Sequence, residues 1–343
     1  MKKYCIAAFL MLLFFSVFAQ TASKQNLQEL KRKEDTLKNY ADKLINGLDA
    51  ATRFKSDSLF TKLFVRALKT PQSFNYPFDS LITISKLYAT DNSFRIFTWQ
   101  LVVNENLTRQ HGAIQMNTQD GSLKLYPLID KSDVTELLAD TTANNKGWIG
   151  AVYYKIIETK GVNKNYYTLL GYDENNIRSN RKIIEVLSFD NGEPVFGGSL
   201  FSFEEDSIAR YAASRHILEY KKTAGTRLTY DPELQMIIAE HLESETNEPT
   251  KKWTYIPDGD YEGFKWKNGK WVHVEKVFNQ VTAEGAEPMP QPVKDAMGNT
   301  MEDKLKENVE EGQSTVEEMP VEKKQIPKPK PKTKSIKKLP VKN

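Results

Sequence analysis

From residue 81 to residue 274 the sequence repeats one pattern, in which short aromatic and β-branched stretches alternate with turns rich in Asn, Asp and Gly. This pattern predicts short β-strands, and such short connections favour antiparallel pairing of consecutive strands. We therefore expect a mainly β, antiparallel meander, folded as a curved or barrel-like sheet. A propeller-like stack is the alternative, although no fixed sequence repeat supports it. The predicted strands are 82–89, 94–103, 112–116, 123–128, 148–158, 166–172, 182–189, 195–203, 215–220, 226–230, 236–241 and 253–256, followed by a final hairpin.

The final hairpin is specified by Asn268-Gly269, a residue pair that favours a two-residue turn between antiparallel strands. This turn places Trp266 directly opposite Trp271. With Phe264 and His273, the two tryptophans occupy one face of the hairpin, because side chains alternate along each strand. We expect this aromatic face to pack inward.

Residues 24–69 predict two helices that form an α-hairpin. Apolar residues recur at helical spacing from Leu27 to Leu48, with Lys, Glu and Asp between them. A second amphipathic stretch follows, and Ser56 or Asp57 is expected to cap its start. The hairpin is expected to pack on the β body, which gives an α+β fold. Binding of a partner protein through these N-terminal helices, as a coiled coil, is the alternative, but the pattern has fewer than four clean heptads.

The two ends of the chain differ from this body, and the sequence divides into four regions. Residues 1–19 are predicted to be a signal peptide, 20–74 a helical region, 75–280 an antiparallel β domain and 281–343 a disordered tail. The tail is first rich in acids and then in Lys and Pro, a composition that buries too little apolar surface to fold.

The predicted signal peptide begins with Lys2 and Lys3 and continues as an apolar run, with cleavage expected after Ala19. A membrane anchor is the alternative, but a spanning helix needs about 20 apolar residues and this run is shorter. We therefore expect export to the periplasm, the cell envelope or the exterior, with no transmembrane segment after cleavage. Cleavage also removes Cys5, the only cysteine, and so excludes disulfides, cysteine–zinc sites and a cysteine nucleophile.

The tail changes the distribution of charge. The whole chain carries a formal charge of +3; without the nine lysines of residues 323–343 it carries −6, and without Lys2 and Lys3 as well it carries −8. An acidic body with a cationic tail predicts attraction of the tail to anionic envelope polymers or lipid headgroups. The alternative is a tail that folds back on the body, and nucleic-acid binding is disfavoured by the acidic body. The tail lysines predicted to mediate envelope association are Lys323, Lys324, Lys328, Lys330, Lys332, Lys334, Lys337 and Lys338.

Turn and strand segments over about residues 75–277 resemble a group of exported proteins of Bacteroidetes with no assigned activity. The resemblance implies envelope localisation and a β fold, and it transfers no active site. The segments that carry it are Tyr88–Trp99, His111–Gln115, Leu123–Leu128, Tyr166–Tyr172 and Tyr261–Trp271.

An aromatic cluster near the end of the body is the first candidate binding site. Aromatic faces beside Asp258, Asp260 and Glu262 suit stacking on a sugar or a peptide, whereas the alternative is cross-strand packing within a sheet. The candidate ligand-binding residues are Trp253, Tyr255, Tyr261, Trp266 and Trp271.

No metal or cofactor is predicted from the sequence. Residues 258–263 begin like a calcium-binding loop, but the twelfth position, which requires a bidentate glutamate, is Gly269. The four histidines, His111, His216, His241 and His273, lack the short spacings of zinc ligands.

Catalytic motifs are also missing from the sequence. Ser214-Arg215-His216 and Glu204-Glu205-Asp206 carry reactive groups, but no nucleophile elbow, zinc-protease motif or phosphate loop supports either. The leading hypothesis is a non-enzymatic envelope or secreted protein that binds a ligand and whose cationic tail mediates envelope association. The alternatives are a secreted hydrolase that acts on glycans through carboxylates and a subunit of an envelope complex that docks through the N-terminal helices.

Overall fold

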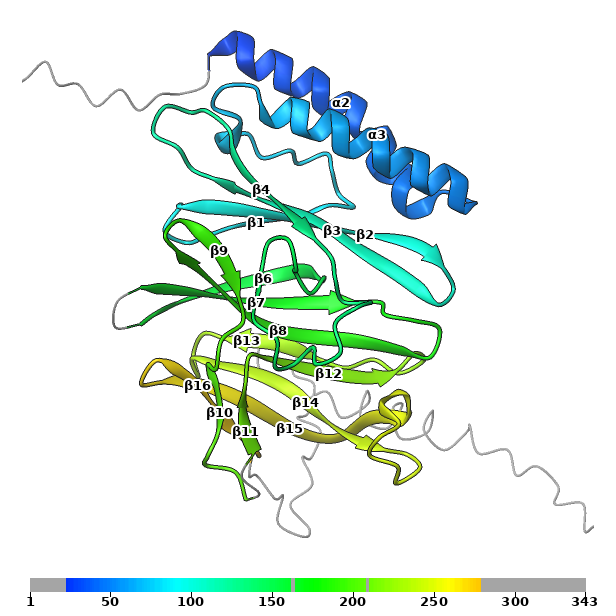
Figure 1. Cartoon of the computed structure of the whole chain (residues 1–343), viewed down its shortest axis with the longest axis vertical. Coiled ribbons are helices and arrows are strands. Elements are labelled where there is room, and N and C mark those ends of the chain that lie inside the picture. The colour runs from blue at the N-terminus through cyan, green and yellow to red at the C-terminus, as the bar shows by residue number, and fades with distance from the viewer. Residues whose placement is uncertain (1–22, 162–163, 208–209, 279–343) are drawn as a thin grey trace, which may run out of the picture. The chain divides into compact units, whose positions relative to one another are not determined.

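The computed structural model describes residues 23–161, 164–207 and 210–278. The predicted signal peptide, its cleavage site and the tail lie outside the described residues. Two helices precede sixteen strands in the described part (Figure 1). The elements are α2 (Lys24–Asn46), α3 (Ala50–Leu68), η1 (Ser73–Asn75), β1 (Ser85–Tyr88), β2 (Phe94–Asn104), β3 (Leu107–Met116), β4 (Lys124–Ile129), β5 (Ala143–Asn144), β6 (Val152–Lys160), β7 (Asn165–Asp173), β8 (Ser179–Asp190), β9 (Glu193–Phe196), β10 (Phe201–Phe203), β11 (Arg210–Ala213), β12 (Arg215–Lys221), β13 (Leu228–Asp231), β14 (Met236–Ser244), η2 (Lys252–Thr254), β15 (Tyr255–Lys267) and β16 (Lys270–Val274).

The strands form three open sheets rather than a closed barrel. The first sheet has the order β1-β2-β3-β4, and the middle sheet has the order β5-β9-β8-β7-β6, with β12 also paired to β8. The last sheet has the order β11-β10-β16-β15-β14-β13. All pairs between these strands are antiparallel except β10 with β16. The predicted mainly β, α+β architecture with an N-terminal helical hairpin is therefore confirmed, and the strands divide among three stacked sheets (Figure 1).

The helical hairpin covers the outer face of the first sheet. Ser23 caps α2 and Asp49 caps α3, so the prediction that Ser56 or Asp57 starts the second helix is wrong. Asp49 takes this role because its side chain accepts a hydrogen bond from the Thr52 backbone, which satisfies one of the free N–H groups of the first turn. The Asp57 carboxylate instead accepts a hydrogen bond from Trp99 of β2 at 2.9 Å.

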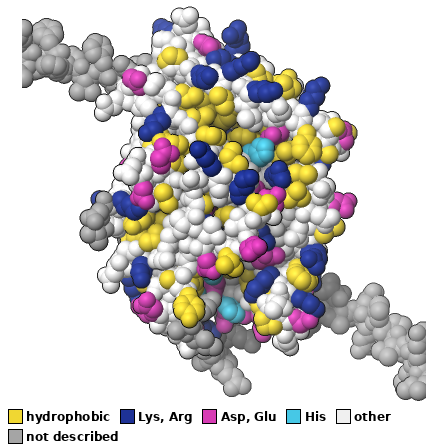
Figure 2. Space-filling view, in the orientation of Figure 1, with side chains coloured by type: hydrophobic (Ala, Val, Ile, Leu, Met, Phe, Trp, Pro, Cys, Tyr) yellow, Lys and Arg dark blue, Asp and Glu magenta, His cyan; other side chains and the backbone are white. Residues whose placement is uncertain are grey.

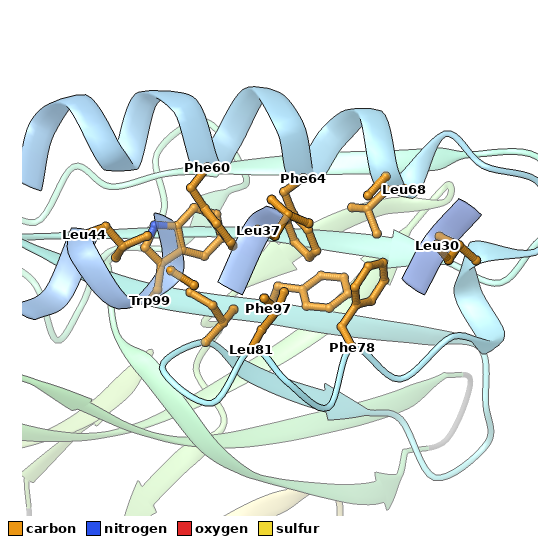
Figure 3. Packing of buried hydrophobic residues seen from close by; sticks show 13 residues of the cluster. Leu30, Leu37, Leu44, Phe60, Phe64, Leu68, Phe78, Leu81, Phe97 and Trp99 are labelled. Carbon is orange, nitrogen blue, oxygen red and sulfur yellow. The ribbon is translucent and has the colours of Figure 1, made fainter. Parts of the chain in front are cut away.

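The apolar stripe of α2 is buried within the molecule. Phe60 and Phe64 of α3 stack on each other and meet Trp99 edge to face, beside the leucines of α2 (Figure 3). Leu27, in the first turns of α2, is partly exposed, and Leu48 lies beyond the end of the helix and is fully exposed. Helix α3 and the first sheet therefore cover the apolar face of α2, which is the face that would form a coiled coil with a partner protein.

The central strands β7 and β8 of the middle sheet are buried on both faces, so consecutive residues such as Ile183 and Ile184 are both apolar and buried. Ile183 and Leu187 of β8 pack toward the first sheet, with Phe94 and Ile114. Ile184 and Val186, which point the other way, pack toward the last sheet with Phe264 and Trp271. Three apolar cores thus join the four layers in order along the chain.

The chain moves from the middle sheet to the last sheet at Gly197-Gly198. The sequence pattern predicts one strand over 195–203, but both glycines have positive φ, at 88° and 123°, and break it into β9 and β10. Because these backbone conformations are open mainly to glycine, the chain can turn here out of one sheet and into the other. It returns to the middle sheet at β12. Strand β12 of the middle sheet and strands β14 and β15 of the last sheet form the walls of the site described next.

Candidate functional site

A cavity of about 580 Å³ lies where the edge of the middle sheet meets the last sheet. Strand β12 forms one wall, β14 and β15 form the other, and the loop 136–140 borders it. This is the kind of concave, partly polar site in which proteins hold small ligands. The polar residues that line it are Glu136, Asp140, Arg181, His216, Glu219, His241, Lys252, Tyr255 and Glu262.

Two carboxylates and two imidazoles contact one another in alternation, and the last two of these four groups line the cavity. Asp206 Oδ1 lies 2.8 Å from His273 Nδ1, and the other ring nitrogen of His273 lies 3.2 Å from Glu262 Oε2. Glu262 Oε1 lies 3.4 Å from His216 Nε2. We call these four residues the relay; Glu262 and His216 are its two members that line the cavity.

Burial and charge set the protonation of the relay. Burial by itself would raise the pKa of Glu262, but its contacts with His216 and His273 outweigh burial and hold that pKa well below its ordinary range. Burial by itself would lower the pKa of His273, but Glu262 and Asp206 outweigh it and raise that pKa. The His273 imidazolium is therefore favoured between the carboxylates of Glu262 and Asp206.

The relay comes together because of strand register. The Asn268-Gly269 turn pairs Phe264 with His273 and Trp266 with Trp271, and the aromatic face packs inward, as predicted. This register sets His273 on the same face of the sheet as Glu262, since cross-strand partners and every second residue share a face. The middle sheet contributes His216 through β12.

Two further side chains around the cavity, His241 and Arg181, are paired with carboxylates. His241 Nδ1 lies 2.6 Å from Asp258 Oδ2. Arg181 Nε donates to Glu219 at 3.0 Å, and the Arg181 guanidinium lies 3.8 Å from Asp173. Lys252 contacts an aromatic residue instead of a carboxylate. Its ammonium donates a hydrogen bond to the Tyr255 hydroxyl at 3.1 Å and lies over the Tyr255 ring.

The segment that begins like a calcium loop is an irregular part of β15. Its pairing with β14 shifts register between Glu240 and Leu242. Its three carboxylates have separate partners: Asp258 contacts His241, Asp260 contacts Lys276 at 3.1 Å, and Glu262 contacts the relay histidines. Within the described ranges, no three acidic or histidine side chains are grouped so that they could hold a metal ion.

The five predicted aromatic binding residues do not form one cluster: Trp266 and Trp271 pack on each other, and of the five only Tyr255 lines the cavity. Trp271 is buried and donates to Thr168 at 2.8 Å, while Trp266 packs on Trp271 and Tyr166. Trp253 lies against the Arg178 guanidinium at 4.0 Å, and Tyr261 packs on Phe278.

The sequence did not reveal that His216 and His241 meet at this cavity, or that His273 contacts Glu262 in its wall. His216 and Asp206 each belong to a triplet considered for catalysis, but their partners are Glu262 and His273 rather than their own neighbours. In the first triplet Arg215 points away from His216 and pairs with buried Glu185. The usable signal was the hairpin register, which places His273 on a face that packs inward.

The fourth histidine belongs to a separate, smaller cavity of about 240 Å³. His111 Nδ1 lies 3.1 Å from Asp57 Oδ1, between α3 and the first sheet. His111 is therefore a natural internal reference for events at the larger cavity.

No protein family, curated protein or solved structure matches the chain in the comparisons made. In the part of the chain that the structure describes, neither helix combines the length and apolar character needed to cross a membrane.

Proposed function

We propose that the protein is an exported, non-enzymatic binding protein that holds a small glycan fragment in the cavity between β12 and β14. The observation that carries the proposal is the cavity itself, whose wall presents hydrogen-bond donors and acceptors side by side. Sugar hydroxyls both donate and accept, so they match such a mixed wall.

The pairing of charges in the wall supports a glycan rather than a nucleic acid. The Arg181 guanidinium is paired with Glu219 and the His241 ring contacts Asp258, so neither side chain is free to bind a phosphate backbone. Lys/Arg and Asp/Glu side chains are also interspersed over the face shown in Figure 2, where the described residues form no broad basic patch.

Histidine NMR tests this proposal, because the chain has only four histidines and two of them, His216 and His241, line the cavity. Addition of soluble glycan fragments (chito-oligosaccharides, malto-oligosaccharides and muramidase-digested peptidoglycan) is expected to shift the ring signals of His216 and His241. The His111 signals are expected to stay unchanged.

A matched pair of variants sharpens the test. His241→Gln is expected to weaken glycan binding about tenfold, the scale of one lost hydrogen bond to a charged group, whereas His111→Gln is expected to leave it unchanged. If no fragment shifts the cavity histidines, or if His111 responds equally, the proposed site is wrong.

We further propose that the lysines of residues 323–343 associate the protein with anionic envelope components after export. Each lysine near such a surface contributes at most about 1 kcal/mol, so the sum depends on several residues and on salt. Deleting residues 323–343 is expected to move the protein from the envelope fraction to the soluble fraction of lysed cells. Retention that is unchanged by the deletion and by salt would contradict this role.

A further inference from the structure

We infer that Asp173 and Gln110 form a proton-controlled switch between the first and middle sheets: one proton bound by Asp173 turns the Gln110 amide, and the change reaches Arg181 in the wall of the β12–β14 cavity. The inference goes beyond the proposed function, because it assigns a regulatory device to residues behind the cavity. It is carried by two buried amide oxygens without partners and by the position of Asp173 between Gln110 and Arg181.

The two amide oxygens belong to Gln110 on β3 and Gln100 on β2. These residues are directly opposite each other in the strand register, so their side chains share one face of the first sheet. Each amide donates through its Nε2, from Gln110 to Asp173 Oδ1 at 3.0 Å and from Gln100 to Glu174 Oε2 at 3.1 Å. Each amide oxygen is buried without a hydrogen-bond partner among the described residues, and Gln110 as a whole is only 1% exposed. Two unpartnered acceptors on neighbouring side chains are costly and call for an explanation.

Half a turn of the Gln110 amide about its last bond satisfies both oxygens. An amide presents an oxygen on one side and an NH2 group on the other, so the turn exchanges the oxygen with the NH2 group that faces Asp173. The NH2 group of Gln110 then donates to the oxygen of Gln100. The oxygen of Gln110 now needs a donor on Asp173, which an ionised carboxylate lacks and a carboxylic acid provides. The turned arrangement therefore belongs to protonated Asp173.

The surroundings of Asp173 favour uptake of this proton. Its side chain is 6% exposed, and the Arg181 guanidinium that lies 3.8 Å away is bound more closely by Glu219, at 3.0 Å. The carboxylate of Asp130, which accepts the backbone N–H of Gln110, adds repulsion. Burial is the largest influence and raises the pKa of Asp173 to about 6, so the proton is exchanged in mildly acidic solution.

The other charged groups next to Asp173 have partners of their own. Glu174, the next residue in the chain, accepts from Gln100 and lies 3.3 Å from the Lys222 ammonium. Lys222 also donates to the backbone carbonyl of Glu174 at 2.9 Å. Neither group therefore takes the place of the proton at Asp173.

Arg181 links the switch to the cavity. It pairs with Asp173 in the register of β8 and β7, and its side chain lines the cavity. When Asp173 is ionised, the guanidinium is shared between Asp173 and Glu219, whereas Glu219 alone holds it when Asp173 is neutral. The N–H groups that faced Asp173 are then open to the hydroxyl groups of a ligand. Acidification is therefore expected to change the cavity wall through Arg181.

NMR of the ligand-free, full-length mature protein tests the switch. The side-chain NH2 signals of Gln110 and the Nε–H signal of Arg181 are expected to shift together between pH 8 and pH 5, with a common midpoint near pH 6. In Asp173→Asn both are expected to stay in place, because residue 173 no longer ionises. Histidines ordinarily ionise in the same pH range, so His241→Gln is the matched control, and it is expected to leave the Gln110 midpoint unchanged.

A second variant tests the turn of the amide itself. Gln100→Met removes the acceptor that the turned Gln110 amide uses, so it is expected to lower the midpoint by about 0.5 to 1 on the pH scale, as one hydrogen bond contributes on this scale. Gln119→Met removes an exposed amide and is expected to leave the midpoint unchanged. A nuclear Overhauser contact between the Gln110 NH2 protons and the Gln100 side chain is expected to be stronger at pH 5 than at pH 8.

The effect on ligand binding is a separate measurement that rests on the proposed function. Titration calorimetry with the N-acetylglucosamine tetramer compares the wild type with Asp173→Asn, in which residue 173 is neutral at every pH. The variant is expected to bind about threefold to tenfold more tightly than the wild type at pH 8, the scale of one hydrogen bond from a charged group. At pH 5 the two proteins are expected to bind equally.

The outcomes separate the switch from the binding function. Gln110 signals that stay in place between pH 8 and pH 5, or that move equally in Asp173→Asn, would overturn the switch. An unchanged midpoint in Gln100→Met would overturn the turn of the amide. A ratio of affinities that is the same at both pH values would overturn the link to the cavity. If no glycan fragment shifts the cavity histidines, the binding function fails, and the Gln110 signals still decide on the switch.

Discussion

Replacing Arg215 with alanine is expected to lower the free energy of unfolding by about 3–5 kcal/mol, because it leaves a buried carboxylate without its cation. Arg215 and Glu185 are opposite each other across β12 and β8, both fully buried, and their charged atoms are 2.7 Å apart. The Tyr153 hydroxyl also donates to Glu185, and Trp148 donates to that hydroxyl at 2.8 Å. Urea unfolding at pH 7 measures the loss.

The double variant Arg215→Met with Glu185→Leu is the control for this prediction. It removes both charges and fills the space with apolar side chains, so it is expected to recover most of the lost stability. Equal destabilisation by the single and double variants would show that the hydrogen bonds of the guanidinium matter more than charge balance. Those bonds reach the carbonyls of Leu138 and Thr141, beside the loop that borders the cavity. Arg215→Ala is therefore also expected to weaken ligand binding.

Replacing Asp173 with asparagine is expected to stabilise the protein by up to about 3 kcal/mol at pH 8. Asp173 is buried at the end of β7, where burial raises its pKa to about 6, against the opposing effects of the Asn175 N–H, Arg181 and Gln110. Keeping this carboxylate ionised in the folded state costs about 1.4 kcal/mol for each unit by which its pKa is raised. Asparagine removes the charge and retains an oxygen that can accept the Asn175 and Gln110 hydrogen bonds.

Because folding raises the pKa of Asp173, the effect of Asp173→Asn on the free energy of unfolding depends on pH in a defined direction. Because the pKa of Asp173 is higher in the folded than in the unfolded chain, wild-type stability contributed by this group falls as the pH rises from about 4 to about 6. The advantage of Asp173→Asn is therefore expected to be near zero below pH 4, to grow through that window and to level off above it. Urea unfolding of both proteins from pH 4 to pH 8 gives the difference directly.

A surface variant serves as the comparison. Asp133→Asn removes a carboxylate that forms an exposed ion pair with Arg109 at 3.0 Å. Such a pair contributes about 0–1 kcal/mol, so this variant is expected to be neutral or slightly destabilising at pH 8. A constant difference between wild type and Asp173→Asn at all pH values would contradict the assignment of the effect to ionisation of Asp173.

Sequence patterns among residues close together in the chain predicted most of the helices and strands. The Asn268-Gly269 turn fixed a register that the structure reproduces pair by pair. The helical spacing that starts at Leu27 identified the buried face of α2 as far as Leu44, whereas Leu48 lies beyond the end of the helix. These features depend on neighbours within a few residues, which a sequence displays directly.

The assembly of the sheets and of the site depends on contacts between distant residues. A single predicted strand at 195–203 is two strands in two sheets, because the break at Gly197-Gly198 matters only in relation to the neighbouring layers. Likewise, His216 and His273 contact the same carboxylate although 57 positions separate them in the numbering, and no local pattern links them. The cap at Asp49 was missed for a simpler reason, since Ser56 and Asp57 are equally good capping residues by type.

The parallel pairing of β10 with β16 has a consequence for the order of folding. Phe201 pairs with Trp271, so about 70 residues of chain separate two strands that adjoin in the last sheet. The first sheet, by contrast, is a simple meander whose contacts are local, so we expect it to form early. In the last sheet, Phe201 and Phe264 share a core that needs the C-terminal hairpin. We therefore expect strands β15 and β16 to complete the fold, and the cavity between β12 and β14 to be among the last features to form.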